Sequence, residues 1–142
     1  MKKIVKVFVV CMLLGLTNAS AQTDLEAITA TLNDYLEGTA NGEPERVTQA
    51  FHKDLNLYSI KNDTLSVWNG QNYITGITPG RKSNRIGRIV SIDYENDAAI
   101  AKIEILMPGP QRIYTDYMML LKIKGSWKIV HKSFTYVNYP KS

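Results

Sequence analysis

Asp116, His131 and Ser133 are the residues whose types and spacing best suit chemistry. They lie in two consecutive strand-like segments that are joined by Lys124-Gly125. If this dipeptide is a two-residue turn, residues at equal distances from it face each other, and all three side chains share one sheet face. An aspartate that orients a histidine forms a general base, which can remove a proton next to a carbonyl group. The alternative is structural, because such a pair can simply hydrogen-bond within the sheet.

A second set of residues is suited to binding a ligand. The same sheet face would carry apolar side chains beside a few polar groups, which is typical of a small-molecule pocket. Aromatic rings elsewhere in the chain could stack on a flat heterocycle such as a pterin or a flavin, or they could form the core. The predicted ligand-binding residues are Tyr35, Phe51, Tyr58, Trp68, Tyr114, Met118, Trp127 and Ser133.

Four basic residues lie close together at Arg81, Lys82, Arg85 and Arg88. Such a run can hold an anionic ligand at the mouth of a cavity. It more often forms a solvated loop, which is the interpretation we favour.

Other reactive arrangements are missing from the sequence. The two histidines, His52 and His131, have no acidic cluster near them, whereas zinc and iron sites usually have three protein ligands. No nucleophile elbow surrounds Ser133, and residues 76–80 lack the lysine and hydroxyl residue of a phosphate-binding loop. The sequence therefore predicts no metal and no cofactor.

The elements that must position these residues are helices first and strands afterwards. Apolar residues recur every three or four positions over 23–38, and Thr23 with Glu26 fits a capping box, so a helix is predicted there. Pro44 suits the first turn of a second, short helix. The segments that follow are predicted as a hairpin over 55–68, a short helix over 69–77 and a loop over 78–84.

The last third of the chain predicts an antiparallel meander. Four segments rich in Ile, Val, Tyr and Met are separated by turn residues and cover 88–94, 98–107, 112–123 and 126–137. Helices followed by strands are typical of an α+β fold, and the lack of repeats and linkers predicts a single domain over 22–142.

Residues 1–21 have the features of a cleavable signal peptide. Three lysines precede an apolar run over 7–16, and Ala19-Ser20-Ala21 fits the small-residue cleavage pattern. The apolar run is too short to span a membrane, which takes about 20 residues in a helix. We therefore expect cleavage between Ala21 and Gln22, and a periplasmic or secreted protein that has no membrane partner.

The mature chain carries little net charge. Without Lys2, Lys3 and Lys6 it has 14 basic and 13 acidic residues, and this net charge of +1 gives no argument for nucleic-acid binding. The single cysteine, Cys11, lies in the signal segment, so the domain has no disulfide. The core alone must therefore hold the fold.

Several motifs follow one another in a familiar order. They are Asp34-Tyr35-Leu36-Glu37-Gly38, Ala50-Phe51-His52, Tyr114-Thr115-Asp116-Tyr117, and the Gly125-Ser126-Trp127-Lys128-Ile129-Val130 ending of the last hairpin. The chain resembles the nuclear transport factor 2-like (NTF2-like) superfamily, which includes SnoaL-like cyclases and ketosteroid isomerases, and within it the putative lumazine-binding family. This resemblance implies a cone-shaped α+β fold with N-terminal helices packed on a curved antiparallel sheet.

The resemblance also implies a cavity on the concave face. The opposite face is too apolar to be simply hydrated, so we expect a homodimer that buries it. The leading functional hypothesis is binding of a small, flat heterocycle without chemistry. The second is a lyase or isomerase that uses Asp116 and His131, and the third is a non-catalytic protein-interaction module, because this fold hosts all three kinds of protein.

Overall fold

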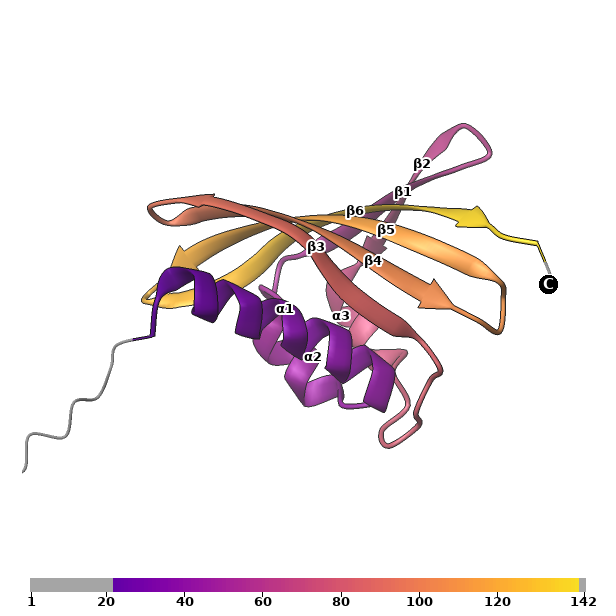
Figure 1. Cartoon of the computed structure of the whole chain (residues 1–142), viewed down its shortest axis with the longest axis horizontal. Helices are drawn as coiled ribbons and strands as arrows, with labels where there is room; N and C mark the ends of the chain where they lie inside the picture. The colour runs from indigo at the N-terminus through magenta and orange to yellow at the C-terminus, as the bar shows by residue number, and fades with distance from the viewer. Residues whose placement is uncertain (1–21, 141–142) are drawn as a thin grey trace, which may run out of the picture.

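The computed structural model describes residues 22–140, so the predicted signal peptide lies outside the described part of the chain. These residues form three helices and one six-stranded sheet (Figure 1). The helices are α1 (Asp24–Asn41), α2 (Pro44–Ala50) and α3 (Gly70–Thr75). The strands are β1 (Asn56–Lys61), β2 (Thr64–Asn69), β3 (Ile86–Glu95), β4 (Ala98–Met107), β5 (Arg112–Ile123) and β6 (Ser126–Asn138). The predicted α+β fold is confirmed, and no helix among the described residues is long and apolar enough to cross a membrane.

The sheet is mixed, whereas the sequence predicted an antiparallel one. Its strand order is β2-β1-β6-β5-β4-β3, and every neighbouring pair is antiparallel except β1 with β6. The hairpin β1–β2 joins the sheet beside β6, where Leu57 lies opposite Lys132 and Tyr58 opposite Ser133. The residue pattern of a hairpin determines only the register between its own two strands. It therefore did not predict that β1 pairs with β6. The helices cover one face of the curved sheet (Figure 1).

Helix α1 begins as the sequence predicts and ends three residues later. Thr23 and Glu26 form the capping box, and the chain leaves the helix at Gly42 in the left-handed conformation (φ 69°). Gly38, the predicted stop, lies inside the helix because α2 approaches there. A Cβ atom on Gly38 would come within 2.8 Å of Val47 Cγ2, so this glycine serves helix packing rather than termination.

One part of the core lies between the first half of α1 and the hairpin end of β5 and β6. Ile28 and Leu32 are fully buried there, with Leu120 and Ile129 from the sheet. Trp127 is also buried, and its indole nitrogen donates a hydrogen bond to Asp24 Oδ1 at 3.0 Å, which fixes the start of α1 on β6. Further along β5, the inward residue changes to the polar Asp116, so the core gives way to a different environment.

A β-bulge in β6 decides which side chains face the helices. The predicted two-residue turn is confirmed, since Ile123 pairs with Ser126 and Leu120 with Ile129. Beyond that point Met119 pairs with His131, so Val130 is an extra residue in β6. One extra residue reverses the alternation of the rest of the strand. Lys132 therefore faces the helices, and His131 faces away.

Candidate functional site

A cavity of about 170 Å³ lies on the inner face of the sheet beside Tyr35. We call it the inner cavity. Residues from α1, α3 and five strands, with Arg85 from the segment before β3, meet around it. The lining residues are Tyr35, Leu57, Trp68, Tyr73, Arg85, Ile105, Met107, Tyr114, Asp116, Lys132 and Phe134.

A buried polar cluster lies in the wall of the inner cavity. Asp116 is fully buried and Lys132 is 5% exposed. Lys132 Nζ lies 2.8 Å from Asp116 Oδ2. The hydroxyl of Tyr35 donates to the same oxygen at 2.9 Å and accepts from Lys132 Nζ at 2.5 Å. Two donors thus converge on one carboxylate oxygen, which fixes the orientation of Asp116.

The second oxygen of Asp116 is free. Asp116 Oδ1 is buried and has no hydrogen-bond partner among residues 22–140. Buried acceptors are almost always paired, so a free one in a cavity wall is expected to have a partner in the functional state. A ligand in the inner cavity would supply that partner.

The environment of Tyr35 keeps its hydroxyl protonated. Burial, and then the negative charge of Asp116, raise the pKa of Tyr35 well above its ordinary value of 10. The ammonium group of Lys132 also lies over three aromatic rings, 4.8 Å from the centre of Tyr35, 5.1 Å from Phe134 and 5.6 Å from Tyr73. The ammonium group thus makes cation–π contacts with these rings.

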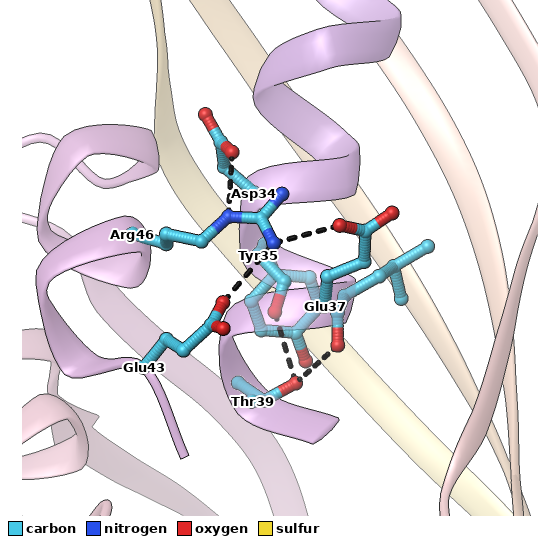
Figure 2. A network of polar contacts seen from close by, with 7 residues as sticks. Asp34, Tyr35, Glu37, Thr39, Glu43 and Arg46 are labelled. Atoms are coloured by element: carbon cyan, nitrogen blue, oxygen red, sulfur yellow. Dashed lines mark hydrogen bonds and ion pairs between the residues drawn. The ribbon is translucent and has the colours of Figure 1, made fainter. Parts of the chain in front are cut away.

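A second polar network holds the helix that carries Tyr35 (Figure 2). Arg46 of α2 binds three carboxylates, at 3.0 Å to Asp34, 2.7 Å to Glu37 and 3.1 Å to Glu43. Its hydrogen bond to Glu37 is the largest of the effects that raise the pKa of Arg46. Thr39 Oγ1 donates to the carbonyl oxygen of Tyr35 at 2.9 Å. This network joins α2 to the outer side of α1 while the Tyr35 side chain points inward.

The prediction that Asp116 and His131 act as a pair is wrong in its geometry. It assumed an unbroken register, and the bulge at Val130 places His131 on the outer face of the sheet. Ser133 lies there too, with its Oγ 2.7 Å from His131 Nε2. Tyr58 stacks on the His131 ring at 4.8 Å between ring centres.

The outer face has an open hollow of about 390 Å³ around His131, Ser133, Tyr117 and Met119. It is larger than the inner cavity, but His131 forms no ion pair with Asp93, the carboxylate in its lining. Tyr117 and Met119 are more than half exposed there. The hollow therefore resembles a contact surface more than a reaction site, and the inner cavity is the candidate site.

The other predicted ligand-binding residues separate into two groups. Tyr35, Trp68 and Tyr114 line the inner cavity. Phe51, Met118 and Trp127 are buried in the core, where Phe51 stacks on Tyr35 at 5.5 Å. Among residues 22–140, no group of three or more His, Cys, Asp or Glu is arranged to hold a metal ion.

Lys132 and Phe134 were not predicted in the site, and Tyr73 was not among the predicted ligand-binding residues. With an unbroken register from the turn, Lys132 would lie on the outer face, and the bulge at Val130 reverses this. Only an indirect signal in the sequence pointed to Lys132: a buried aspartate requires a positive charge nearby.

The fold and the enclosed site define an NTF2-like protein, and solved structures agree. An NTF2-like protein of unknown function from Methylobacillus flagellatus has a TM-score of 0.70 and 27% identity, covering 83% of this chain and 96% of that one. An NTF2-like protein from Shewanella baltica has a TM-score of 0.70 and 23% identity, covering 84% and 100%. The second likeness shows the fold alone.

The chain belongs to the family described as "Putative lumazine-binding", whose model matches residues 23–135. The predicted family is thereby confirmed. Among characterised relatives, the chain is similar to the aldolase FrzH of a Cladobotryum species. The two are 28% identical over 120 residues, which cover 84% of this chain and 94% of that protein.

Proposed function

We propose that the protein binds a small carbonyl compound in the inner cavity and transfers a proton at the carbon next to its carbonyl group. One observation carries this proposal: Asp116 is held through Oδ2 by Tyr35 and Lys132, while its Oδ1 is buried and free. A carboxylate oxygen without a partner, on a residue that lines the cavity, is suited to act as a general base.

The neighbours of Asp116 suit the charge that such a step develops. Removing a proton next to a carbonyl places negative charge on the carbonyl oxygen. Lys132 brings a positive charge to the cavity wall, and fixed positive groups stabilise such an oxyanion in a site with little water. The same residues therefore serve both halves of the step, with Asp116 taking the proton and Lys132 stabilising the oxygen.

The relatives support this class of reaction. Aldol bond formation by acid–base catalysis starts with removal of a proton next to a carbonyl group, and the FrzH protein is described as an aldolase. The second predicted hypothesis, a lyase or isomerase, is thus kept with a different partner for Asp116. Tyr35 and Lys132 take the place that was predicted for His131.

Binding of a flat heterocycle without chemistry is the second candidate function. The aromatic rings of Trp68, Tyr73, Tyr114 and Phe134 in the cavity lining favour it. Proton exchange distinguishes the two candidates. A ligand that quenches Trp68 fluorescence, but whose protons do not exchange with solvent, supports binding alone.

We further propose that the protein is exported and acts as a homodimer. Ile100, Tyr117, Met119 and Leu121 expose apolar surface on the outer face of the sheet, and a second copy of the chain would cover it. The inner cavity lies on the other face, so it would stay accessible in such a dimer.

The test is exchange of protons for deuterium in small aldehydes, ketones and oxo acids dissolved in D₂O, followed by NMR. The wild-type protein is expected to speed up the exchange of the protons next to the carbonyl group for at least one compound. Asp116→Asn is expected to lower that rate by about 10²–10⁴-fold, since it removes the base. The control His131→Ala changes the outer face only and should keep the rate. Equal rates for wild type and Asp116→Asn would overturn the proposal.

A further inference from the structure

The inner cavity contains more positive than negative side-chain charge. Its lining has two cations, Arg85 and Lys132, and one carboxylate, Asp116. Lys132 and Asp116 form an ion pair. Arg85 has no carboxylate within ion-pair distance among residues 22–140. A guanidinium in a cavity wall without a counter-ion indicates that the ligand supplies the negative charge.

The hydrogen-bonding edge of Arg85 is almost empty. Arg85 Nε is buried and has no partner among the described residues, and Nη2 reaches only the weak acceptor Met107 Sδ, at 3.6 Å. Nε and Nη2 form the side edge of the guanidinium group, whose two parallel donors match the two oxygens of a carboxylate. Met107 has a flexible side chain, so a ligand oxygen can displace its sulfur.

Arg85 stays charged in this position. Burial acts to lower its pKa, but Tyr73, Tyr35 and Asp116 together outweigh burial, so the pKa of Arg85 is raised. The side chain is therefore a positive group in the wall that it shares with Tyr35 and Tyr73.

Arg85 also lies where the inner cavity meets a second hollow of about 250 Å³. Both are lined by Trp68, Tyr73 and Arg85, and the second adds the exposed Arg81. The other arginine of this basic run differs, because Arg88 pairs with Glu104 on the outer face. The shared lining points to Arg85 as the group that receives an anion at the entrance.

We propose that the ligand of the inner cavity is a small monocarboxylate, and that Arg85 binds its carboxylate through Nε and Nη2. This inference rests on the proposed function, and it narrows the carbonyl substrate to an oxo acid. The carboxylate lies at Arg85, and the rest of the molecule extends toward Asp116 and Lys132.

Calorimetric titration with benzoate and benzamide tests the inference, because these flat compounds have nearly the same shape and differ in charge. Wild type is expected to bind benzoate more tightly than benzamide. Arg85→Gln is expected to weaken benzoate binding roughly ten- to hundredfold and to remove the preference. The matched control Arg88→Gln should bind benzoate as wild type does. Arg85→Lys keeps the charge and loses the paired donors, so it should show weaker benzoate binding with part of the preference retained.

Three results would overturn the inference: equal affinity of wild type for the two compounds, no benzoate binding by wild type, or benzoate binding that survives in Arg85→Gln. None of these changes the deuterium exchange of neutral ketones or its dependence on Asp116, so the proposed function can survive alone. Conversely, a benzoate preference that depends on Arg85, without any Asp116-dependent exchange, would leave a carboxylate-binding protein without that chemistry.

Discussion

At the scale of single residues, we expect mutations in the ion pair of Lys132 and Asp116 to have the largest effect on stability. Both side chains are almost completely buried, and their closest atoms are 2.8 Å apart. Removing one partner of a buried pair leaves the other charge without compensation, which costs more than the pair itself contributes.

Lys132→Met is therefore expected to lower the free energy of unfolding by about 3–5 kcal/mol. The double variant Asp116→Asn/Lys132→Met should recover most of this loss, because no uncompensated charge remains. Lys128→Met, on the same strand with an exposed ammonium group, is the control and should change stability by less than about 1 kcal/mol. Urea denaturation measures all three, and equal losses for Lys132→Met and the double variant would contradict the account.

The contribution of Tyr35 to the stability of the protein is lost at alkaline pH. Its pKa is raised above 10 in the folded state, so the unfolded chain loses this proton first as the pH rises. The contribution of the tyrosine is fully present below pH 10 and is lost progressively above it. Tyr35→Phe is expected to cost about 1–2 kcal/mol at neutral pH through lost hydrogen bonds, and the gap to wild type should narrow above pH 10. Thermal denaturation measures this difference in stability. A difference that stays constant up to pH 11 would contradict the predicted pH dependence.

Part of the site was readable from the sequence. Tyr114 and Asp116 were predicted on the inner face because β5 alternates regularly from the turn, and Tyr35 because α1 has one apolar stripe. Lys132 was not, because the bulge that turns it inward leaves no mark in the residue types around Val130. The place of Arg85 in the cavity wall depends on how the segment before β3 packs, which no local pattern specifies.

At the scale of elements, the junction of α1 and α2 depends on Arg46. Three carboxylates surround its guanidinium group, and the side chain is only one-third exposed. Arg88 on β3 also pairs with a carboxylate, but its side chain is 72% exposed. Several partners around a half-buried arginine stabilise more than one exposed pair does.

Arg46→Gln is expected to lower the free energy of unfolding by about 1 kcal/mol, and Arg88→Gln by about half of that or less. Both variants remove one positive charge, so the difference measures the network and not the net charge. The same urea titrations report it. A loss for Arg88→Gln as large as that for Arg46→Gln would show that the network adds nothing.

Local sequence patterns predicted some structural elements correctly and others not. The capping box, the turn at Lys124-Gly125 and the four long strands follow from local chemistry, and they were predicted. The end of α1 was misplaced because Gly38 serves a contact with α2. The parallel pairing of β1 with β6 was missed because it depends on tertiary packing.

At the scale of the whole molecule, the sheet has two different faces. The helices cover one face (Figure 1). The other face exposes apolar side chains of β4 and β5. Met119 is 51% exposed and pairs with Ile100, which is 55% exposed. Such a patch is typical of a surface that a partner covers.

Met119→Lys is therefore expected to convert a dimer into a monomer, because it places a charge within the apolar contact. Gln49→Lys adds the same charge on the exposed side of α2 and should leave the dimer unchanged. Light scattering at micromolar concentration distinguishes the two states. A wild-type protein that is already monomeric under these conditions would contradict the proposed dimer.

The central claim is that a small molecule binds in the inner cavity and not in the hollow on the outer face. Met107 lines the inner cavity and Met119 lines the outer hollow, so their methyl groups report on the two sites separately. The most direct measurement is an NMR titration of protein carrying ¹³C-methyl methionine with phenylpyruvate, which combines a ring, a ketone and a carboxylate. We expect the Met107 signal to shift and the Met119 signal to stay in place. A shift of Met119 alone, or of neither signal, would contradict it.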